Sequence, residues 1–485
     1  MNEQHFREWF AKSADVIIKS YRFRDTNPTP NVLLLYCDGM CKIEHLEHVI
    51  LPQLHAMLTD ELNLQASRLN VSTMLQLDEI TGPNLMESLT VSLYQGQVIL
   101  FFEETQLVFA LNIASPPNRS PEESSTETSI KGPRDAFTEN ITTNIALVRK
   151  RLLTRSLCCE KMDIGKRSHT SVALLYMDDI IDLDMIMEVK QRLLSLDVDG
   201  LISSAQLEER VSGTKYPFFP LMDYAGRPDY IADSLLRGRF AILIDGSPMA
   251  LIAPASLMFI LKSPEDVHFP FYYVAFERIL RVGGLIVSTL LPGFWIAVSA
   301  FNIEQLPFPL VATISSSRLG LPISGPMDFI IMLVLFELFR EAGMRLPKVV
   351  GQTVTVVGGL IVGDAAIRAG ITSPTTLVVT SISTISMYTL VNQSLSGTVT
   401  VLRTLILIIS ATFGIFGFML ALMGVILYLA TLESFGVPYL SPVSPPQFKE
   451  MTASLLAKPW SKLKRRPGTL NPNDATRQGP GEEPS

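Results

Sequence analysis

Three long stretches without a charged residue constrain this chain most. They run over Val282–Phe301, Thr372–Leu402 and Thr404–Leu432, all in the second part of the 485-residue sequence. About 20 apolar residues in a helix are enough to cross a bilayer. We therefore predict an α+β membrane protein, in which a water-soluble front half precedes a bundle of transmembrane helices.

Charge and cysteine content narrow the class further. The formal net charge of -7 gives no reason to expect binding to nucleic acid. Met1–Tyr21 carries charges throughout and no continuous apolar core, so it is unlike a signal peptide, and the front half is expected in the cytoplasm. The four cysteines show no disulfide framework and are expected to be reduced.

The front half contains an internal duplication. Each copy begins with an apolar strand that ends in an aromatic and an acidic residue, Val32–Asp38 in the first and Val172–Asp178 in the second. An amphipathic helical pattern follows each strand. A later match aligns Gly96 with Gly238 at nearly the same spacing, so two copies of one α/β unit explain both similarities.

These patterns divide the chain into five parts. We predict cytoplasmic α/β subdomains over residues 1–114 and 134–270, joined by a Pro-, Ser- and Glu-rich linker over 115–133 that is too polar to bury a core. A transmembrane helical domain is predicted over 271–435. A cytoplasmic tail over 436–485 is expected to be largely disordered.

A helix predicted over Ile141–Leu153 ends in a group of basic residues. A solvated helix end, favoured by the helix dipole, is one interpretation of this group, and contact with lipid phosphates or a neighbouring subunit is the other. The basic residues are Arg149, Lys150, Arg151 and Arg155.

The front half contains one pattern that zinc could use. Cys37, Cys41, His45 and His48 have helical spacing, but Asp38-Gly39 interrupts the start of the helix and the second copy has no matching cysteine or histidine. We therefore predict ordinary packing residues, with no metal and no other cofactor. The front half also lacks a P-loop, a nucleophile elbow and an HExxH motif, so no enzymatic activity is predicted.

The apolar half contains four candidate spans. A fifth segment, Phe329–Phe336, is too short to cross alone and is expected to be re-entrant or interfacial. Basic residues in the tail favour a cytoplasmic C-terminus, and an even number of spans keeps both ends on that side. This arrangement leaves Arg340 and Arg345 outside, against the positive-inside tendency. The spans are Val282–Phe301, Val349–Ala366, Pro374–Val391 and Thr404–Leu432.

A series of motifs from about Gly132 to Pro442 resembles the A subunit of the GerA-type spore germinant receptors. The likeness covers this part of the chain in order. Its motifs are Gly132–Arg151, Tyr216–Pro220, Arg227–Asp229, Gly238–Ser247, Ser263–Asp266, Pro307–Pro309, Glu337–Pro347, Gly351-Gln352 and Ser434–Tyr439.

The resemblance implies a multi-pass protein of the spore inner membrane of endospore-forming bacteria. Such a subunit is expected to act with a transporter-like B subunit, which binds the nutrient, and a lipoprotein C subunit. It is expected to oligomerise into a nutrient-gated ion channel. A paralogous branch, from the operon for dipicolinate release, shares much of the pattern. Leu333, Asp364, Arg368 and residues 391–394 depart from it, which leaves the ion preference and the branch open.

Two groups of residues are candidates for the channel. A stripe at helical steps of three and four is either pore lining or simple helix packing, and because the resemblance implies a channel we predict pore lining, with Val362 as a hydrophobic gate. A second group is a set of charges at membrane depth, which is either an interfacial helix end or a collar beside the gate. The stripe is Gln352, Thr355, Gly359, Val362 and Ala366, and the charges are Glu337, Arg340, Glu341 and Arg345.

Two other functional classes stay open. A membrane-anchored scaffold, or an amplifier of the germination signal as in the paralogous branch, would gather partners and conduct nothing. A transporter is the third possibility, and the absence of an inverted repeat among the spans counts against it.

Overall fold

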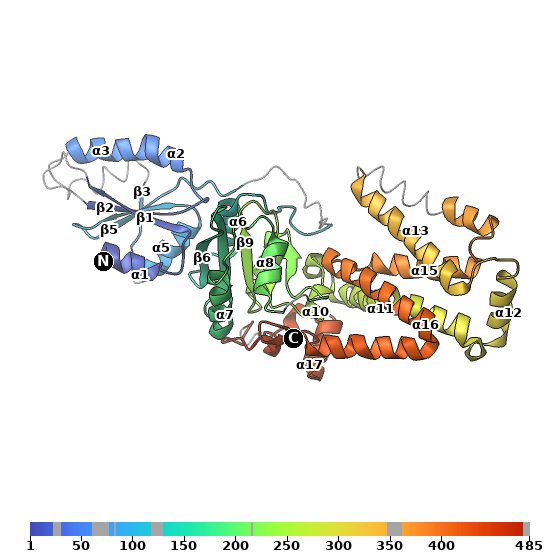
Figure 1. The fold of residues 1–485 in the computed structure, drawn as a ribbon. Helices are drawn as coiled ribbons and strands as arrows, with labels where there is room; N and C mark the ends of the chain where they lie inside the picture. Colours follow the sequence, from blue (N-terminus) through green and yellow to red (C-terminus); the bar gives the residue numbers. More distant parts are fainter. Residues whose placement is uncertain are drawn as a thin grey trace.

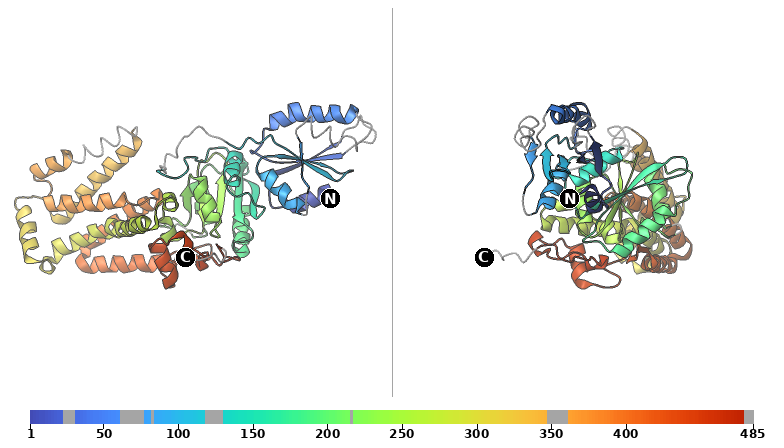
Figure 2. Two further views of the ribbon diagram at one scale, coloured as in Figure 1. Left: turned by 180° about the vertical axis from the view of Figure 1, so that it is seen from behind. Right: turned by 90° about the vertical axis from the view of Figure 1, so that its left-hand side faces the viewer.

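The computed structural model is elongated (Figures 1 and 2). A first α/β unit lies at one end, a helical bundle at the other, and a second α/β unit between them, with the C-terminal segment beside the second unit. The structure describes residues 1–22, 31–60, 77–81, 84–117, 130–214, 217–346 and 361–478.

The first unit is a five-stranded antiparallel sheet of order β1-β2-β4-β5-β3 with helices on both faces. Alternate residues of β2 point to opposite faces, so Leu33 and Leu35 pack against α1 and α5, whereas Leu34 packs against η1 and α3. The elements are α1 Glu3–Trp9, β1 Val16–Arg22, β2 Asn31–Cys37, α2 Ile43–His45, η1 Leu46–Ile50, α3 Leu51–Asp60, β3 Leu77–Glu79, α5 Leu85–Tyr94, β4 Val98–Phe102 and β5 Leu107–Leu111.

The second unit repeats this sheet in the order β6-β7-β9-β10-β8. Val32 pairs with Phe102 in the first unit, and the equivalent Val172 pairs with Ile244 in the second, which confirms the predicted duplication. The elements are α6 Ile141–Arg149, β6 Leu157–Ile164, β7 Thr170–Met177, α7 Leu183–Leu194, α8 Ser204–Val211, β8 Asp223–Ala225, α9 Pro228–Leu235, β9 Phe240–Ile244, β10 Ala250–Ala253, α10 Leu257–Ile260 and η2 Pro264–Val267.

The helical bundle follows directly from the second unit. Two of its helical segments, Phe271–Phe301 and Gln393–Thr431, are long and apolar enough to cross a membrane. Residues 361–368 are also helical. The named elements are α11 Phe271–Ile296, η3 Ala297–Phe301, η4 Ile303–Gln305, α12 Phe308–Ser317, α13 Gly325–Arg345, α15 Pro374–Met387 and α16 Gln393–Thr431.

The structure changes two of the predicted segments. Phe329–Phe336 is not a short piece but the middle of the 21-residue helix α13. The charged residues that seemed to end it continue the helix, because they form ion pairs three and four residues apart. The predicted span Pro374–Val391 is the 14-residue helix α15, and Val349–Ala366 lies mostly outside the described residues.

The predicted span Thr404–Leu432 is part of a longer helix that reverses its direction. Gly414 has φ 62° and ψ -143°, a conformation that favours glycine, and it divides α16 into two legs, residues 393–413 and 415–431. Thr398 of the first leg and Tyr428 of the second both hydrogen-bond to Phe218, so the legs are antiparallel (Figure 1). A single straight span is therefore wrong here.

The tail also differs from the expectation, because its described residues pack on the second unit. Arg466 donates to the carbonyl of Leu236 at 2.8 Å, and Arg477 pairs with Asp233 at 3.0 Å. These partners lie far away in the sequence, so the polar composition of the tail did not reveal them. The described part of the tail therefore has a defined structure. Its elements, with the preceding strand β11 Glu433–Ser434, are β12 Val437–Pro438, α17 Phe448–Leu455, η5 Trp460–Lys462 and η6 Gly468–Leu470.

Candidate functional site

The predicted charge cluster divides into an inner and an outer part. Glu337 of α13 pairs with Arg340 and, at 2.8 Å, with Arg403 of α16. Glu341 and Arg345 pair with each other at 2.7 Å, and their side chains are 50% and 79% exposed. The inner part therefore joins two helices inside the bundle, whereas the outer pair lies on its surface.

Arg403 is the member of this cluster that the sequence analysis missed. Its side chain is 1% exposed. Within the described residues, only Nη2 of Arg403 has a partner, and Nε and Nη1 of Arg403 and Nε of Arg340 donate no hydrogen bond. A buried arginine of this kind is costly at membrane depth. The signal was available, because Arg403 is the one charge that separates two long apolar stretches.

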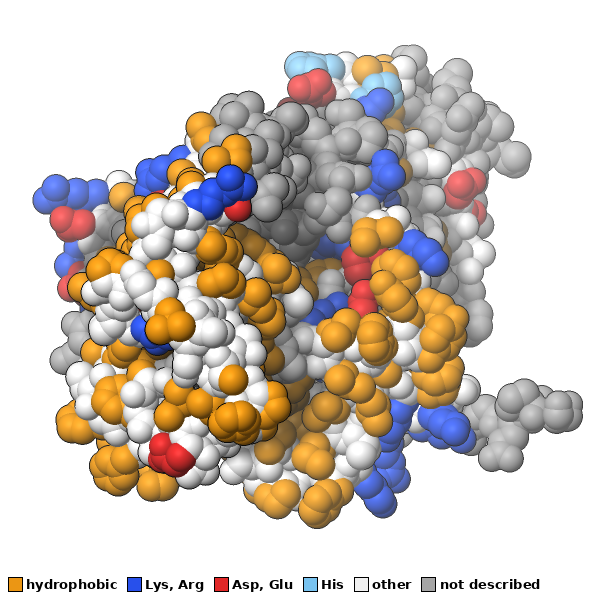
Figure 3. Space-filling view, turned by 90° about the vertical axis from the view of Figure 1, so that its right-hand side faces the viewer, with side chains coloured by type: hydrophobic (Ala, Val, Ile, Leu, Met, Phe, Trp, Pro, Cys, Tyr) orange, Lys and Arg blue, Asp and Glu red, His pale blue; other side chains and the backbone are white. Residues whose placement is uncertain are grey.

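Two arginines and one glutamate give this inner cluster an excess of positive charge. Figure 3 shows acidic and basic side chains on the floor of a hollow among hydrophobic ones at this end of the molecule. Unused N–H donors and an uncompensated charge are features of a site that interacts with ions or with another charged group. We call Glu337, Arg340 and Arg403 the inner charge cluster.

The predicted pore stripe is only partly visible. Gln352, Thr355 and Gly359 lie outside the described residues. Val362 is half-buried, and Ala366 is buried in the helical stretch 361–368. That stretch packs closely on α15, since a Cβ on Gly363 would lie 3.3 Å from the side chain of Leu377. The assignment of the stripe to a pore remains a prediction.

Asp328 of α13 is a second buried charge that the sequence analysis passed over. It is fully buried and accepts hydrogen bonds from Thr376 Oγ1 at 2.9 Å and from the Ser373 amide at 3.4 Å, which ties α13 to the start of α15. Its Oδ1 has no hydrogen-bond partner among the described residues. Asp328 thus joins the inner charge cluster as an incompletely satisfied charged group among the described residues of the bundle.

Where the second unit meets the bundle, Asp223 contacts the start of α16. Asn392 donates to Asp223 at 2.6 Å and also caps α16 by accepting from the Leu395 amide. Tyr230 donates to the same carboxylate at 3.2 Å. Burial raises the pKa of Asp223 to about 7 despite these hydrogen bonds. A cavity of about 170 Å³, which Lys262 also lines, adjoins this contact.

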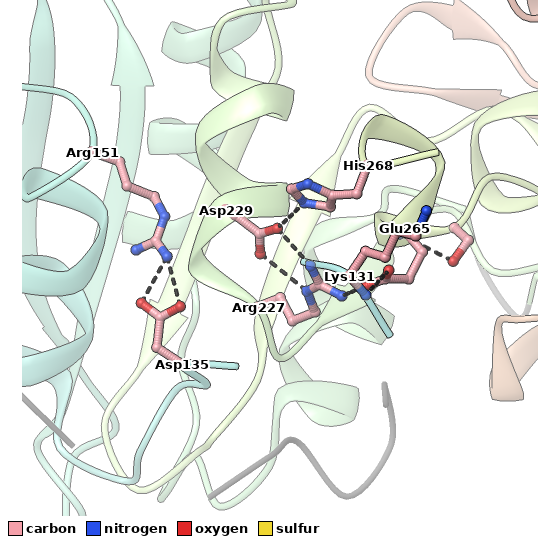
Figure 4. Close-up of polar contacts among 8 residues, drawn as sticks. Lys131, Asp135, Arg151, Arg227, Asp229, Glu265 and His268 are labelled. Atoms are coloured by element: carbon pink, nitrogen blue, oxygen red, sulfur yellow. Dashed lines mark hydrogen bonds and ion pairs between the residues drawn. The ribbon is translucent and has the colours of Figure 1, made fainter. Parts of the chain in front are cut away.

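A second contact joins the linker to the second unit (Figure 4). Arg227, 2% exposed, pairs with Asp229 at 2.7 Å and with Glu265, and His268 contacts Asp229 at 3.1 Å. Burial would raise the pKa of Asp229, but the Arg227 guanidinium holds it below its ordinary value. Gly132 lies against this group, since a Cβ there would be 2.1 Å from Arg227 Nη2.

The basic end of α6 is partly buried and partly exposed to solvent. Arg149 is fully buried and makes two hydrogen bonds to Asp15 of the first unit, at 2.8 and 2.9 Å. Arg151 pairs with Asp135 (Figure 4), and Arg155 stacks on Trp9 at 4.0 Å. Both interpretations are wrong for Arg149, because Asp15 of the first unit is its partner. Lys150 and Arg155 are exposed, so a solvated helix end describes these two residues, and contact with lipid or a neighbouring subunit remains a prediction for them.

Of the four possible zinc ligands, the two cysteines are packing residues as predicted, whereas His45 and His48 are exposed on α2 and η1. Cys37 and Cys41 are buried in the first unit, and burial raises the pKa of Cys41 to about 11, which keeps this thiol protonated and a poor ligand. Within the described ranges, no group of three His, Cys, Asp or Glu side chains is placed to hold a metal ion.

Comparison with known proteins extends over almost the whole chain. A family model described as the Bacillus/Clostridium GerA spore germination protein matches residues 4–469. Spore germination protein XA of Bacillus anthracis is 41% identical over 99% of this chain and 97% of its own length. The uncharacterized membrane protein YfkQ of Bacillus subtilis is 33% identical over 93% of this chain and 88% of its own.

A solved structure also shows similarity. It is the N-terminal domain of the A subunit of the Bacillus megaterium spore germinant receptor GerK3, with 28% identity and a TM-score of 0.38. The match covers 52% of this chain and 92% of the solved chain.

Proposed function

The chain belongs to the GerA family of spore germination proteins, and from this we propose that it is the A subunit of a germinant receptor in the spore inner membrane. In this proposal it is a multi-pass, non-enzymatic protein that forms a homo-oligomeric, nutrient-gated ion channel. It acts with a transporter-like B subunit and a lipoprotein C subunit. The two α/β units and the tail lie in the cytoplasm.

The inner charge cluster is the observation that carries the proposal. Two donors of Arg403 have no partner among the described residues. A bundle built only to anchor the protein gains nothing from such a buried arginine, because apolar residues of similar volume pack there at lower cost. Charged groups at this depth are typical of ion pathways. Val362, in the helical stretch 361–368, is the proposed hydrophobic gate.

The arrangement of the soluble parts supports the proposed orientation. The tail packs on the second α/β unit through Arg466 and Arg477, so these parts lie on one side of the bundle. The contacts of Asp223 with Asn392 and of Asp266 with Arg278 and Arg281 link the second unit to α16 and α11. A signal from partner subunits would reach the bundle through them.

Ion flux from liposomes that contain the purified full chain tests the proposal. Val362→Ala is expected to make the closed channel leaky, because a smaller side chain weakens a hydrophobic gate. Val378→Ala, in α15 where the side chain is 56% exposed, is the matched control and should not leak. Absence of flux in every variant, with and without the B and C subunits, would contradict the channel.

The alternative is a scaffold or signal amplifier that conducts nothing. The rigid contact of the first unit with the second, through Asp15 and Arg149, is compatible with a platform for partners. In that case the same liposomes would show no flux, while complexes with the B and C subunits would still form.

A further inference from the structure

We propose that the tail carries a binding surface for anionic phospholipid headgroups of the cytoplasmic leaflet. This inference rests on the proposed membrane location of the bundle but not on ion conduction. The surface, which we call the tail patch, consists of two exposed aromatic and four exposed basic residues on α17 and the segment after it. Its members are Phe448, Lys449, Trp460, Lys462, Lys464 and Arg465.

The position of α17 along α11 is the first argument. Arg278 of α11 donates to the carbonyl of Ser454 in α17 at 3.2 Å. Arg281 is the last charged residue of α11, and the uncharged part begins at Val282. The tail helix therefore lies beside the turn of α11 where the surface changes from charged to apolar, which is where the headgroups of a bilayer around the bundle would be.

Aromatic side chains mark the same level on α11. Phe271, Tyr272, Tyr273 and Phe276 are between 44% and 67% exposed, although they are large. Rings of this kind gather at the interface between membrane and water. Phe448 and Trp460 of the tail patch are 71% and 62% exposed, so the tail adds two exposed aromatic side chains to those of α11.

The charges of the tail patch are complementary to anionic lipid. Among the described residues, Lys449, Lys462, Lys464 and Arg465 form no ion pair. Figure 3 shows basic side chains gathered near the lower right edge, beside hydrophobic side chains. Lys and Arg side chains near an anionic membrane surface are attracted to it. An apolar anchor combined with several such charges suits an interfacial element.

The rest of the tail holds the patch in place. Arg477 pairs with Asp233 and lies 4.7 Å from the ring of Trp460, while Glu450 accepts from the Gly468 amide at 2.7 Å. Because these contacts attach the tail to the second unit, headgroup binding would fix the second unit relative to the membrane surface.

Tryptophan fluorescence of the full chain in lipid nanodiscs tests the proposal. The chain has three tryptophans, and a variant with Trp9→Phe and Trp295→Phe reports on Trp460 alone. We expect lipids that carry a quencher near the headgroup to quench Trp460 at least about twofold more in phosphatidylcholine–phosphatidylglycerol nanodiscs than in phosphatidylcholine alone. High salt should reduce the difference.

Charge-reversal variants show whether the extra quenching depends on the tail patch or on attraction of any basic residue to anionic lipid. Lys449→Glu combined with Lys462→Glu and Lys464→Glu should abolish the extra quenching. Lys166→Glu with Arg167→Glu, two exposed basic residues of the β6–β7 turn, should leave it unchanged. Circular dichroism before and after these changes shows whether the chain is still folded.

A variant that retains only Trp295, in α11, distinguishes failure of this inference from failure of the membrane proposal. Quenching of Trp295 without quenching of Trp460 would overturn the tail patch alone, and protection of Trp460 only by added B or C subunit would assign the surface to a protein partner. No quenching of Trp295 by lipids labelled at any depth would instead refute the membrane location. Equal quenching of Trp460 in both lipid mixtures also overturns the proposal.

Discussion

Two buried arginines in this molecule have opposite surroundings. Arg149, between the two α/β units, uses all three of its nitrogens: two bond to Asp15, and Nη1 bonds to the carbonyls of Thr154 and Leu157. Its guanidinium also stacks on Tyr94 at 4.2 Å. Arg403, inside the bundle, has one partner and two unused nitrogens among the described residues.

The difference in hydrogen bonding between Arg149 and Arg403 indicates that the two residues have different roles. A charge that is buried and fully hydrogen-bonded fixes the geometry of its neighbours, whereas a charge that is buried and incompletely bonded is retained at a cost to stability. We therefore assign Arg149 to the assembly of the two units and Arg403 to the proposed ion pathway.

The largest expected effect comes from breaking the satisfied pair. Asp15→Ala leaves Arg149 buried without its carboxylate and should lower the free energy of unfolding by about 3–5 kcal/mol. Thermal unfolding of the full chain in detergent measures this, with Asp163→Ala, an exposed residue of β6, as the control. Asp15→Leu together with Arg149→Met should regain most of the lost stability. If it does not, the ion pair contributes more to stability than the mutual neutralisation of two buried charges.

A somewhat smaller effect is expected where the linker meets the second unit. Gly132→Ala places a methyl group against Arg227, Glu265 and His268, and overpacking of this kind costs about 1–3 kcal/mol. Gly397→Ala is the matched control, because a Cβ there meets nothing within 4 Å. Equal melting temperatures for the two variants would contradict this prediction, because they would show that the side chains around Arg227 can move to accommodate the methyl group.

Asp223 is a buried carboxyl group whose protonation makes the stability of the protein depend on pH. Its pKa of about 7 exceeds the ordinary value of about 3.9, so the folded protein retains a proton that the unfolded chain has lost. The stability that this proton contributes is complete below about pH 4 and is lost as the pH rises through about 7. The melting temperature should therefore fall between about pH 4 and pH 7 and level off above that, and Asp223→Asn should flatten the decline. An unchanged profile would mean that Asp223 does not set it.

The smallest change in stability is expected at Arg403. Arg403→Met removes two donors that have no partner among the described residues and leaves Glu337 paired with Arg340, so the free energy of unfolding should stay within about 1 kcal/mol of the wild-type value or rise. A loss as large as that of Asp15→Ala would show that Arg403 is a structural residue, and the comparison between the two arginines would fail.

The sequence predicted the duplication and the apolar bundle because both depend on patterns of neighbouring residues. Strand periodicity and the spacing of Tyr36 and Tyr176 indicated two copies, and the sheets have the same order. Contacts between distant segments were missed: Asp15 with Arg149, Glu337 with Arg403 and the tail with the second unit. The reversal at Gly414 was also missed, since a glycine in an apolar helix gives no sign of its φ.

The reversal potential of the open channel tests the central claim most directly. In a KCl gradient across a bilayer that contains Val362→Ala, the added change Arg403→Met removes a positive charge from the proposed pathway. The reversal potential should shift toward the K⁺ equilibrium potential, because repulsion of cations falls and attraction of anions is lost. An identical reversal potential in the two variants, or no current in either, would contradict the assignment of Arg403 to an ion pathway.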